Sequence, residues 1–162
     1  MKPTTLCFVI RENELLLGMK KGGFGAGKYN GFGGKIQEGE TFRACAVRET
    51  WEESSLLIKE EDLRCIGLLD FRFPFSPELD HIGYIYLVDT YEGIPLESEE
   101  MEPQWFPLEN LPFDQMWEGD RVWLPKLLEG TCIEGHVTFG EDNQRVIDME
   151  LREVESIHEL DE

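Results

Sequence analysis

The sequence has few basic residues, few cysteines and no long apolar segment. Its 162 residues include 15 Lys and Arg against 34 Asp and Glu, which gives a formal net charge of −19. A chain this acidic repels polyanions and anionic membrane surfaces, so a role in binding DNA, RNA or a membrane is disfavoured. A small anionic substrate is still compatible, provided that local lysines or bound cations reverse the charge of one pocket.

Cysteine spacing and hydropathy also limit the compartment. The four cysteines are spread along the chain without a C-x-x-C pair, which argues against a zinc cluster or a disulfide framework and favours a reducing compartment. No apolar run approaches the ~20 residues that cross a bilayer, and the N-terminus does not resemble a signal peptide. We therefore expect a cytoplasmic protein, and, because no long exposed apolar helix demands a partner, a monomer.

Common nucleotide-binding motifs and linkers are missing as well. Lys35 is followed by Ile36, where a P-loop has Ser or Thr, and there is no G-x-G-x-x-G. No internal repeat or Ser/Pro-rich linker divides the chain. We predict one domain over residues 1–162, in which the acidic segment from Glu155 to Glu162 frays.

The order of the predicted elements indicates an α+β fold with a mixed sheet. Apolar patterns and turn residues predict strands over residues 4–10, 14–19, 69–75, 81–89, 104–106, 133–139 and 146–151. Thr41 is suited to cap a helix that ends near Ser54, whereas Pro125 limits a helix over residues 121–128 to a first-turn or broken form. Seven of the 13 residues from Gly22 to Gly34 are glycine, which predicts an irregular loop.

Three glutamates share one face of the first predicted helix. At about 100° per residue, Glu49, Glu52 and Glu53 fall within one arc, and the opposite side, which includes Trp51, is expected to pack. Adjacent carboxylates need a cation, and hard oxygen ligands without histidine or thiolate favour magnesium or manganese over zinc. Arg48, one turn before Glu52, can hold part of the cluster. The alternative is a solvated helix face, which is the more common meaning of a charge run.

The residues around this cluster resemble the Nudix box. The box runs Gly, five residues, Glu, seven residues, Arg-Glu, hydrophobic, any residue, Glu-Glu, any residue, Gly, hydrophobic. Its charged and leading glycine positions match at full spacing, as Gly34, Glu40, Arg48, Glu49, Glu52 and Glu53. Two positions depart: Thr50 occupies the hydrophobic site, and Ser55 replaces the glycine that normally takes a left-handed conformation after the helix.

A more specific resemblance covers nearly the whole chain. Segments 16–21, 23–27, 30–35, 97–98, 100–101, 105–106, 116–117 and 151–154 are similar to the oxidised-purine nucleoside triphosphatases of the animal type. This resemblance implies a Nudix fold, with a mixed β-sheet sandwiched between α-helices. It also implies hydrolysis of small-molecule purine nucleoside triphosphates such as 8-oxo-dGTP and 2-hydroxy-dATP to the monophosphate and pyrophosphate, which sanitises the nucleotide pool and avoids DNA damage.

The resemblance further implies a metal site and a catalytic base. The implied ligands of magnesium, or of manganese as a substitute, are Glu49, Glu52, Glu53, Glu100 and the carbonyl of Gly33. Magnesium bridging phosphate oxygens neutralises developing charge, and one carboxylate can deprotonate the attacking water. We favour Glu53 as that base, with Glu100 as its competitor, and we interpret Arg48 as an orienting residue.

The implied substrate pocket combines aromatic, polar and basic residues. Its predicted members are Thr5, Lys20, Phe24, Asn30, Phe32, Gly33, Gly34, Lys35, Phe71, Trp117 and Asp120. Aromatic faces sandwich a purine, while Asn30 and Asp120 supply hydrogen bonds to its edge. Core packing is the alternative for Phe71 and for Trp123, which is a further candidate for the pocket. Solvent exposure is the alternative for Lys20.

One substitution in this pocket bears on the choice of base. Relatives of this type carry two adjacent acids where this chain has Gly119-Asp120, which predicts a narrower, shifted or weaker base preference. The loop around His81 also differs, but no role is expected for the three histidines. The alternatives left open are a Nudix hydrolase of another nucleoside diphosphate derivative, such as a dinucleoside polyphosphate, a non-catalytic nucleotide-binding module, and an acidic interaction protein without a ligand.

Overall fold

The computed structural model describes residues 1–159. Its strands are β1 (Lys2–Arg11), β2 (Glu14–Lys20), β3 (Tyr29–Asn30), β4 (Phe32–Lys35), β5 (Arg64–Arg72), β6 (His81–Val88), β7 (Met101–Pro107), β8 (Cys132–Phe139) and β9 (Val146–Val154). Its α-helices are α1 (Phe42–Ser54) and α2 (Asp120–Leu128), and the short 3-10 helices are η1 (Glu60–Asp62), η2 (Pro77–Leu79) and η3 (Phe113–Gln115).

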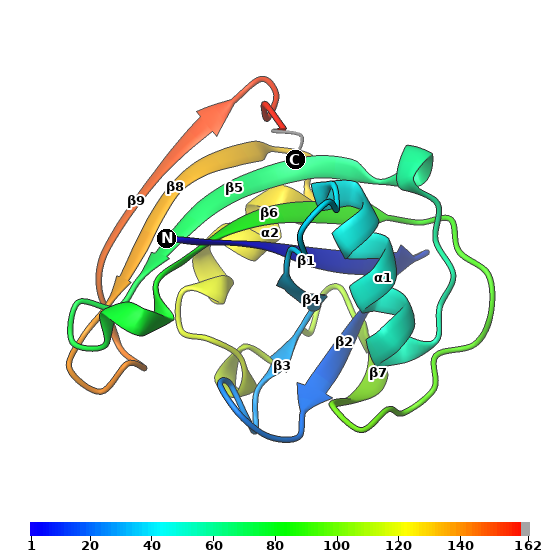
Figure 1. The fold of residues 1–162 in the computed structure, drawn as a ribbon, viewed down its shortest axis with the longest axis horizontal. Coiled ribbons are helices and arrows are strands. Elements are labelled where there is room, and N and C mark those ends of the chain that lie inside the picture. The colour runs from blue at the N-terminus through cyan, green and yellow to red at the C-terminus, as the bar shows by residue number, and fades with distance from the viewer. Residues whose placement is uncertain (160–162) are drawn as a thin grey trace.

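All these strands belong to one mixed sheet. The order is β3-β2-β1-β6-β5-β8-β9, with β4 paired to β1 and β7 paired to β2. The pairs β1–β6 and β5–β8 are parallel, and the others are antiparallel. Helix α1 lies over one face of the sheet and α2 lies behind it (Figure 1). The predicted α+β class, with a mixed sheet between helices, is confirmed.

Alternation along β1 explains the two packing layers. Cys7 and Val9 belong to the cluster that contains Phe42 of α1, whereas Phe8 belongs to the cluster that contains Trp123 of α2. Successive side chains of a strand point to opposite faces, so one buried strand serves both cores. None of the helices in the described part of the chain is long and apolar enough to cross a membrane.

Helix α1 has the predicted bounds but not the predicted packing side. The Thr41 hydroxyl accepts a hydrogen bond from the Ala44 amide at 3.1 Å, and Ser55 takes the left-handed conformation with φ of 65°. Trp51, which was expected to pack, is 53% exposed, and Glu53 is buried. The face that packs carries Phe42, Cys45, Ala46, Thr50, Glu53 and Ser54, whereas Glu52 is exposed. Gly34 of β4 leaves room for the Glu49 side chain, because a Cβ there would lie 2.7 Å from the Glu49 carboxyl.

The glycine-rich segment is more regular than predicted. Residues 29–30 and 32–35 form β3 and β4, and β4 pairs with β1 so that Gly33 lies opposite Leu6. A Cβ on Gly33 would lie 1.8 Å from the Thr5 carbonyl oxygen, so glycine here permits a close approach of two strands. The prediction of an irregular loop therefore holds only for the first part of the segment.

Two other element boundaries differ from the sequence predictions. The strand expected at residues 69–75 is β5, which ends at Arg72, and Phe75 is 58% exposed. Helix α2 spans nine residues, Asp120–Leu128, and Pro125 lies inside it. The buried side chains of Trp123 and Leu127 anchor this helix on the sheet, and such packing outweighs the lost backbone hydrogen bond.

The segment after β9 docks on the protein. Ile157 is buried, and Glu159 accepts hydrogen bonds from Arg43 Nε at 3.0 Å, from Arg43 Nη2 at 2.9 Å and from the Tyr86 hydroxyl at 2.7 Å. The prediction that this segment frays is therefore wrong for residues 155–159. Residues 160–162 lie outside the described residues.

We expect the bidentate contact of Arg43 to contribute to stability. Arg43→Ala should lower the free energy of unfolding by about 1–2 kcal/mol, because a charge-assisted pair is lost and Glu159 keeps fewer partners. Urea unfolding would measure this, with Arg64→Ala as the control because Arg64 is an exposed arginine of β5. Equal effects of the two substitutions would contradict the docking role.

Candidate active site

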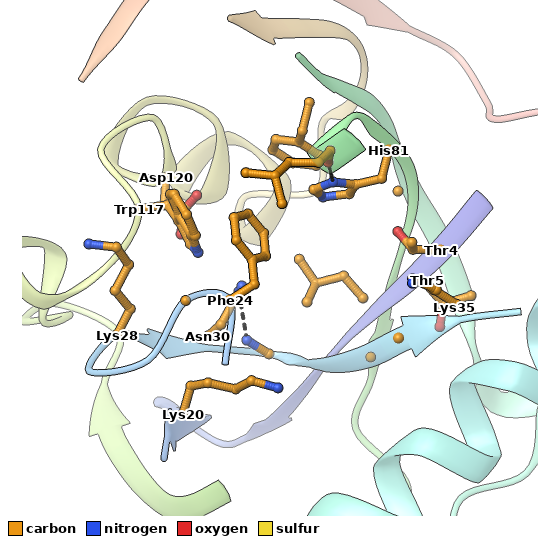
Figure 2. A pocket seen from close by; sticks show the side chains of 18 of the residues that line it. Thr4, Thr5, Lys20, Phe24, Lys28, Asn30, Lys35, His81, Trp117 and Asp120 are labelled. Atoms are coloured by element: carbon orange, nitrogen blue, oxygen red, sulfur yellow. Dashed lines mark hydrogen bonds between the residues drawn. The ribbon is translucent and has the colours of Figure 1, made fainter. Parts of the chain in front are cut away.

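A cavity of about 380 Å³ lies beside β1 and β4 (Figure 2). Among the predicted substrate residues, those that line it are Thr5, Lys20, Phe24, Asn30, Gly33, Gly34, Lys35, Phe71, Trp117 and Asp120. Phe32 does not line the cavity: it is fully buried in the core. The prediction that Phe32 contacts the substrate is corrected, because its side chain points away from this side of β4.

The cavity concentrates positive charge in a very acidic protein. Four of the seven lysines in the chain line it, Lys2, Lys20, Lys28 and Lys35. Glu53 and Asp120 are the two carboxylates among the described lining residues. Local lysines thus offset the overall negative charge at this one place, as an anionic ligand requires.

One end of the cavity is a layer of aromatic rings. The centroids of Phe24 and Trp117 are 5.0 Å apart, and those of Trp117 and Phe139 are 5.4 Å apart. Lys28 Nζ lies 5.2 Å from the centroid of Trp117. Rings grouped around an open space suit a flat heteroaromatic ligand.

Two buried polar atoms in the cavity wall are without a hydrogen-bond partner in the described part of the chain. They are Asp120 Oδ2 and Trp123 Nε1. Buried polar groups normally have partners, so a polar ligand edge is the simplest complement to both atoms. Trp123 is also a core residue, with its ring 6.2 Å from that of Phe8, so the two interpretations of this residue are compatible.

Burial raises the pKa of Asp120 to about 8 from an ordinary value of 3.8. Because the folded-state pKa is the higher one, the stability linked to this proton is full below about pH 4 and is lost as the pH rises to about 8. We expect the free energy of unfolding to fall between about pH 5 and about pH 9 by about 4 kcal/mol more in the wild type than in Asp120→Asn. Urea unfolding at both pH values tests this, and parallel losses would contradict it.

The other end of the cavity holds the predicted base. Glu53 is 2% exposed and accepts a hydrogen bond from the Gly33 amide at 3.0 Å. Burial, a hydrogen bond with Glu100 and the charge of Glu49 raise the pKa of Glu53 to about 9. The carboxylates thus repel one another without a cation. Lys20 Nζ lies 4.0 Å from Glu100 Oε2.

Arg48 organises the acidic residues outside the cavity. Its Nε lies 2.7 Å from Glu40 Oε2, and its Nη1 lies 2.6 Å from Glu49 Oε1 and 3.0 Å from Glu52 Oε1. As the side chains stand, no group of three or more His, Cys, Asp or Glu residues within residues 1–159 is arranged to hold a metal ion. The chemistry of the donors nevertheless fits a hard cation, because Glu49 and Glu100 raise the pKa of the buried Glu53 carboxyl and carboxylate oxygens are hard ligands.

Sequence reasoning missed several members of the cavity. Lys28, Phe73, His81 and Phe139 line it, although no role was expected for the histidines. Among these four residues, only Lys28 had a signal in the local sequence, which is its position in the glycine-rich loop. The positions of the other three depend on strand pairing. Gly119 does not line the cavity, and a Cβ there would lie 2.9 Å from Met149 Cε.

Comparisons with known proteins agree over most of the chain. The model of the NUDIX domain matches residues 1–127. The chain is 47% identical over 152 residues to the oxidized purine nucleoside triphosphate hydrolase of Mus musculus, covering 94% of this chain and 95% of that protein. It is 44% identical over 156 residues to the protein of the same name from Danio rerio, covering 96% and 97%. A solved MutT structure from Bacillus halodurans shares the fold, with a TM-score of 0.79 and 21% identity over 93% of this chain and 97% of that one.

Proposed function

Because the chain belongs to the Nudix family, we propose that it hydrolyses oxidised purine nucleoside triphosphates to the monophosphate and pyrophosphate. The substrates proposed are 8-oxo-dGTP and 2-hydroxy-dATP, and hydrolysis would remove them from the nucleotide pool. The observation that carries the proposal is that one cavity joins an aromatic end with Asn30 and Asp120, several lysines, and Glu53. The names of the mouse and zebrafish relatives support the same substrate class.

Nudix hydrolases generally need a divalent metal ion, and we propose Mg²⁺, with Mn²⁺ as a substitute. The proposed ligands are Glu49, Glu52, Glu53, Glu100 and the Gly33 carbonyl. The cation would supply the positive charge that keeps these carboxylates ionised and would neutralise phosphate oxygens. Arg48 positions Glu49 and Glu52 through its guanidinium group, and we assign it no contact with the substrate.

Glu53 is the proposed general base. Its carboxyl is fixed by the Gly33 amide and lies at the cavity wall, where a water molecule beside a bound phosphate could give it a proton. Glu100 is the competitor for this role, because it hydrogen-bonds to Glu53. Lys20 and Lys35 face the same space and would hold the phosphate oxygens.

The remaining predictions concern partners and location. We propose a monomeric, cytoplasmic enzyme that acts on free nucleotides and binds neither nucleic acid polymers nor membranes. The net charge of −19 supports this, because it repels extended polyanions, while the lysines of the cavity attract a small one.

Identification of the products tests the proposed reaction. Purified protein with Mg²⁺ is given 8-oxo-dGTP, 2-hydroxy-dATP, ATP and diadenosine tetraphosphate, and the products are separated by chromatography. We expect the oxidised nucleotides to give monophosphate and pyrophosphate fastest. Preference for diadenosine tetraphosphate would show another Nudix substrate class, and saturable binding without hydrolysis would show a non-catalytic module.

A further inference from the structure

His81 is a cavity residue whose ring is held by its neighbours. It begins β6, opposite Phe71 of β5 and Lys2 of β1. Its ring stacks on Phe71 with centroids 5.0 Å apart and an angle of 25°, and it meets Phe24 edge to face at 6.3 Å. Figure 2 shows the imidazole projecting into the cavity on the side away from Trp117 and Asp120.

The hydrogen bond of this ring fixes its tautomer. Nδ1 lies 2.8 Å from the Leu79 carbonyl oxygen, and since a carbonyl only accepts, Nδ1 carries the proton. Within residues 1–159, the ring makes this one hydrogen bond, through Nδ1. The lone pair of Nε2 is therefore available to a ligand. Burial and the charge of Lys2 lower the pKa of His81, and they outweigh the hydrogen bond to Leu79 and the charge of Asp80, which raise it. The lowered pKa favours the neutral ring.

A hydrogen-bond acceptor at this place distinguishes two kinds of purine lesion. N7 of an ordinary purine carries a lone pair, but oxidation at C8 in the 8-oxo form turns N7 into an N–H donor. Hydroxylation at C2 leaves the N7 lone pair unchanged. An acceptor that faces N7 therefore gains a hydrogen bond with an 8-oxo-purine that it does not gain with an ordinary purine or a 2-hydroxy-purine.

We propose that His81 Nε2 accepts a hydrogen bond from N7–H of a purine oxidised at C8, and that His81 is a specificity-determining residue for this lesion. The inference rests on the proposed function. Asn30, Asp120 and His81 line one cavity, and Asp120 lies to the other side of Phe24 from His81 (Figure 2), so Asp120 and His81 can address different edges of one bicyclic base. His81 thus supplies a polar contact to the base from the β6 side of the cavity.

Binding of nucleoside monophosphates tests this role without metal or catalysis. Dissociation constants for 8-oxo-dGMP, dGMP and 2-hydroxy-dAMP are measured by calorimetry for the wild type, His81→Phe and His81→Gln. The phenyl ring keeps the stacking but has no acceptor, whereas glutamine restores one. His136→Phe is the matched control, because His136 pairs with Asp148 and does not line the cavity.

We expect His81→Phe to weaken binding of 8-oxo-dGMP about 3- to 10-fold, the loss typical of one neutral hydrogen bond. It should not weaken binding of dGMP or 2-hydroxy-dAMP, and His81→Gln should recover part of the loss. Equal weakening of all three ligands, or none, would overturn the inference and leave the proposed function intact. If the wild type itself does not bind 8-oxo-dGMP more tightly than dGMP, the proposed preference for oxidised purines fails, and the inference fails with it.

Discussion

Glu53→Gln should lower kcat for 8-oxo-dGTP by at least about a thousandfold, since it removes both the proposed base and a proposed metal ligand. Glutamine has nearly the same shape and can still contact the Gly33 amide through its oxygen. The protein should therefore fold and bind the product 8-oxo-dGMP with little change. Steady-state kinetics with Mg²⁺ measure the loss, and calorimetry with 8-oxo-dGMP measures retained binding.

Glu52→Gln is the matched control for this prediction. The Glu52 side chain is 52% exposed and does not line the cavity, so its replacement should cost clearly less activity than that of Glu53. If Glu53→Gln kept more than about a tenth of the activity, Glu100 would be the better candidate for the base. Equal losses for the two variants would indicate a role in metal binding alone.

Trp117→Ala should lower kcat/KM for 8-oxo-dGTP about 30-fold, mainly by raising KM. The indole is a wall of the aromatic end of the cavity, and stacking of a base on an aromatic ring contributes about 1–3 kcal/mol. Trp117→Phe should lose less, because it keeps a ring. Initial rates over a range of substrate concentrations separate KM from kcat.

The control for Trp117 is another tryptophan at the surface. Trp51 is 53% exposed on α1 and is not part of the cavity, so Trp51→Ala should leave both constants nearly unchanged. A fall in kcat with unchanged KM in Trp117→Ala would contradict a binding role and would indicate that the ring acts through the position of Asp120.

Local chemistry allowed the first helix to be predicted well. Thr41 sets its start through a contact within a few residues, and such capping is readable from sequence. Ser55 takes the left-handed conformation at its end, although the sequence has no glycine there to signal it. Its packing side was not readable, because both sides mix polar and apolar residues. The decisive fact, that Gly34 lets the Glu49 side chain approach β4, depends on a strand pairing that sequence patterns do not show.

The candidate site also combines features that the sequence predicts with features that depend on strand pairing. The carboxylates and the substrate residues came from a motif and a resemblance, and ten of the eleven predicted substrate residues line the cavity. The prediction for Phe32 was wrong because successive side chains of a strand point to opposite faces, and the Phe32 side chain points into the core. His81 was missed because its place in the cavity comes from the pairing of β6 with β5 and with the distant β1, a register that sequence patterns do not show.

The most direct test of the central claim is the ratio of kcat/KM for 8-oxo-dGTP to that for dGTP, measured with Mg²⁺ on the wild-type protein. A site that reads an oxidised base should give a ratio of at least about 10, because buried polar groups are left unpaired by the wrong base. A ratio near one, with both nucleotides hydrolysed, would contradict the account: the reaction would stand, but the cavity would not select oxidised purines.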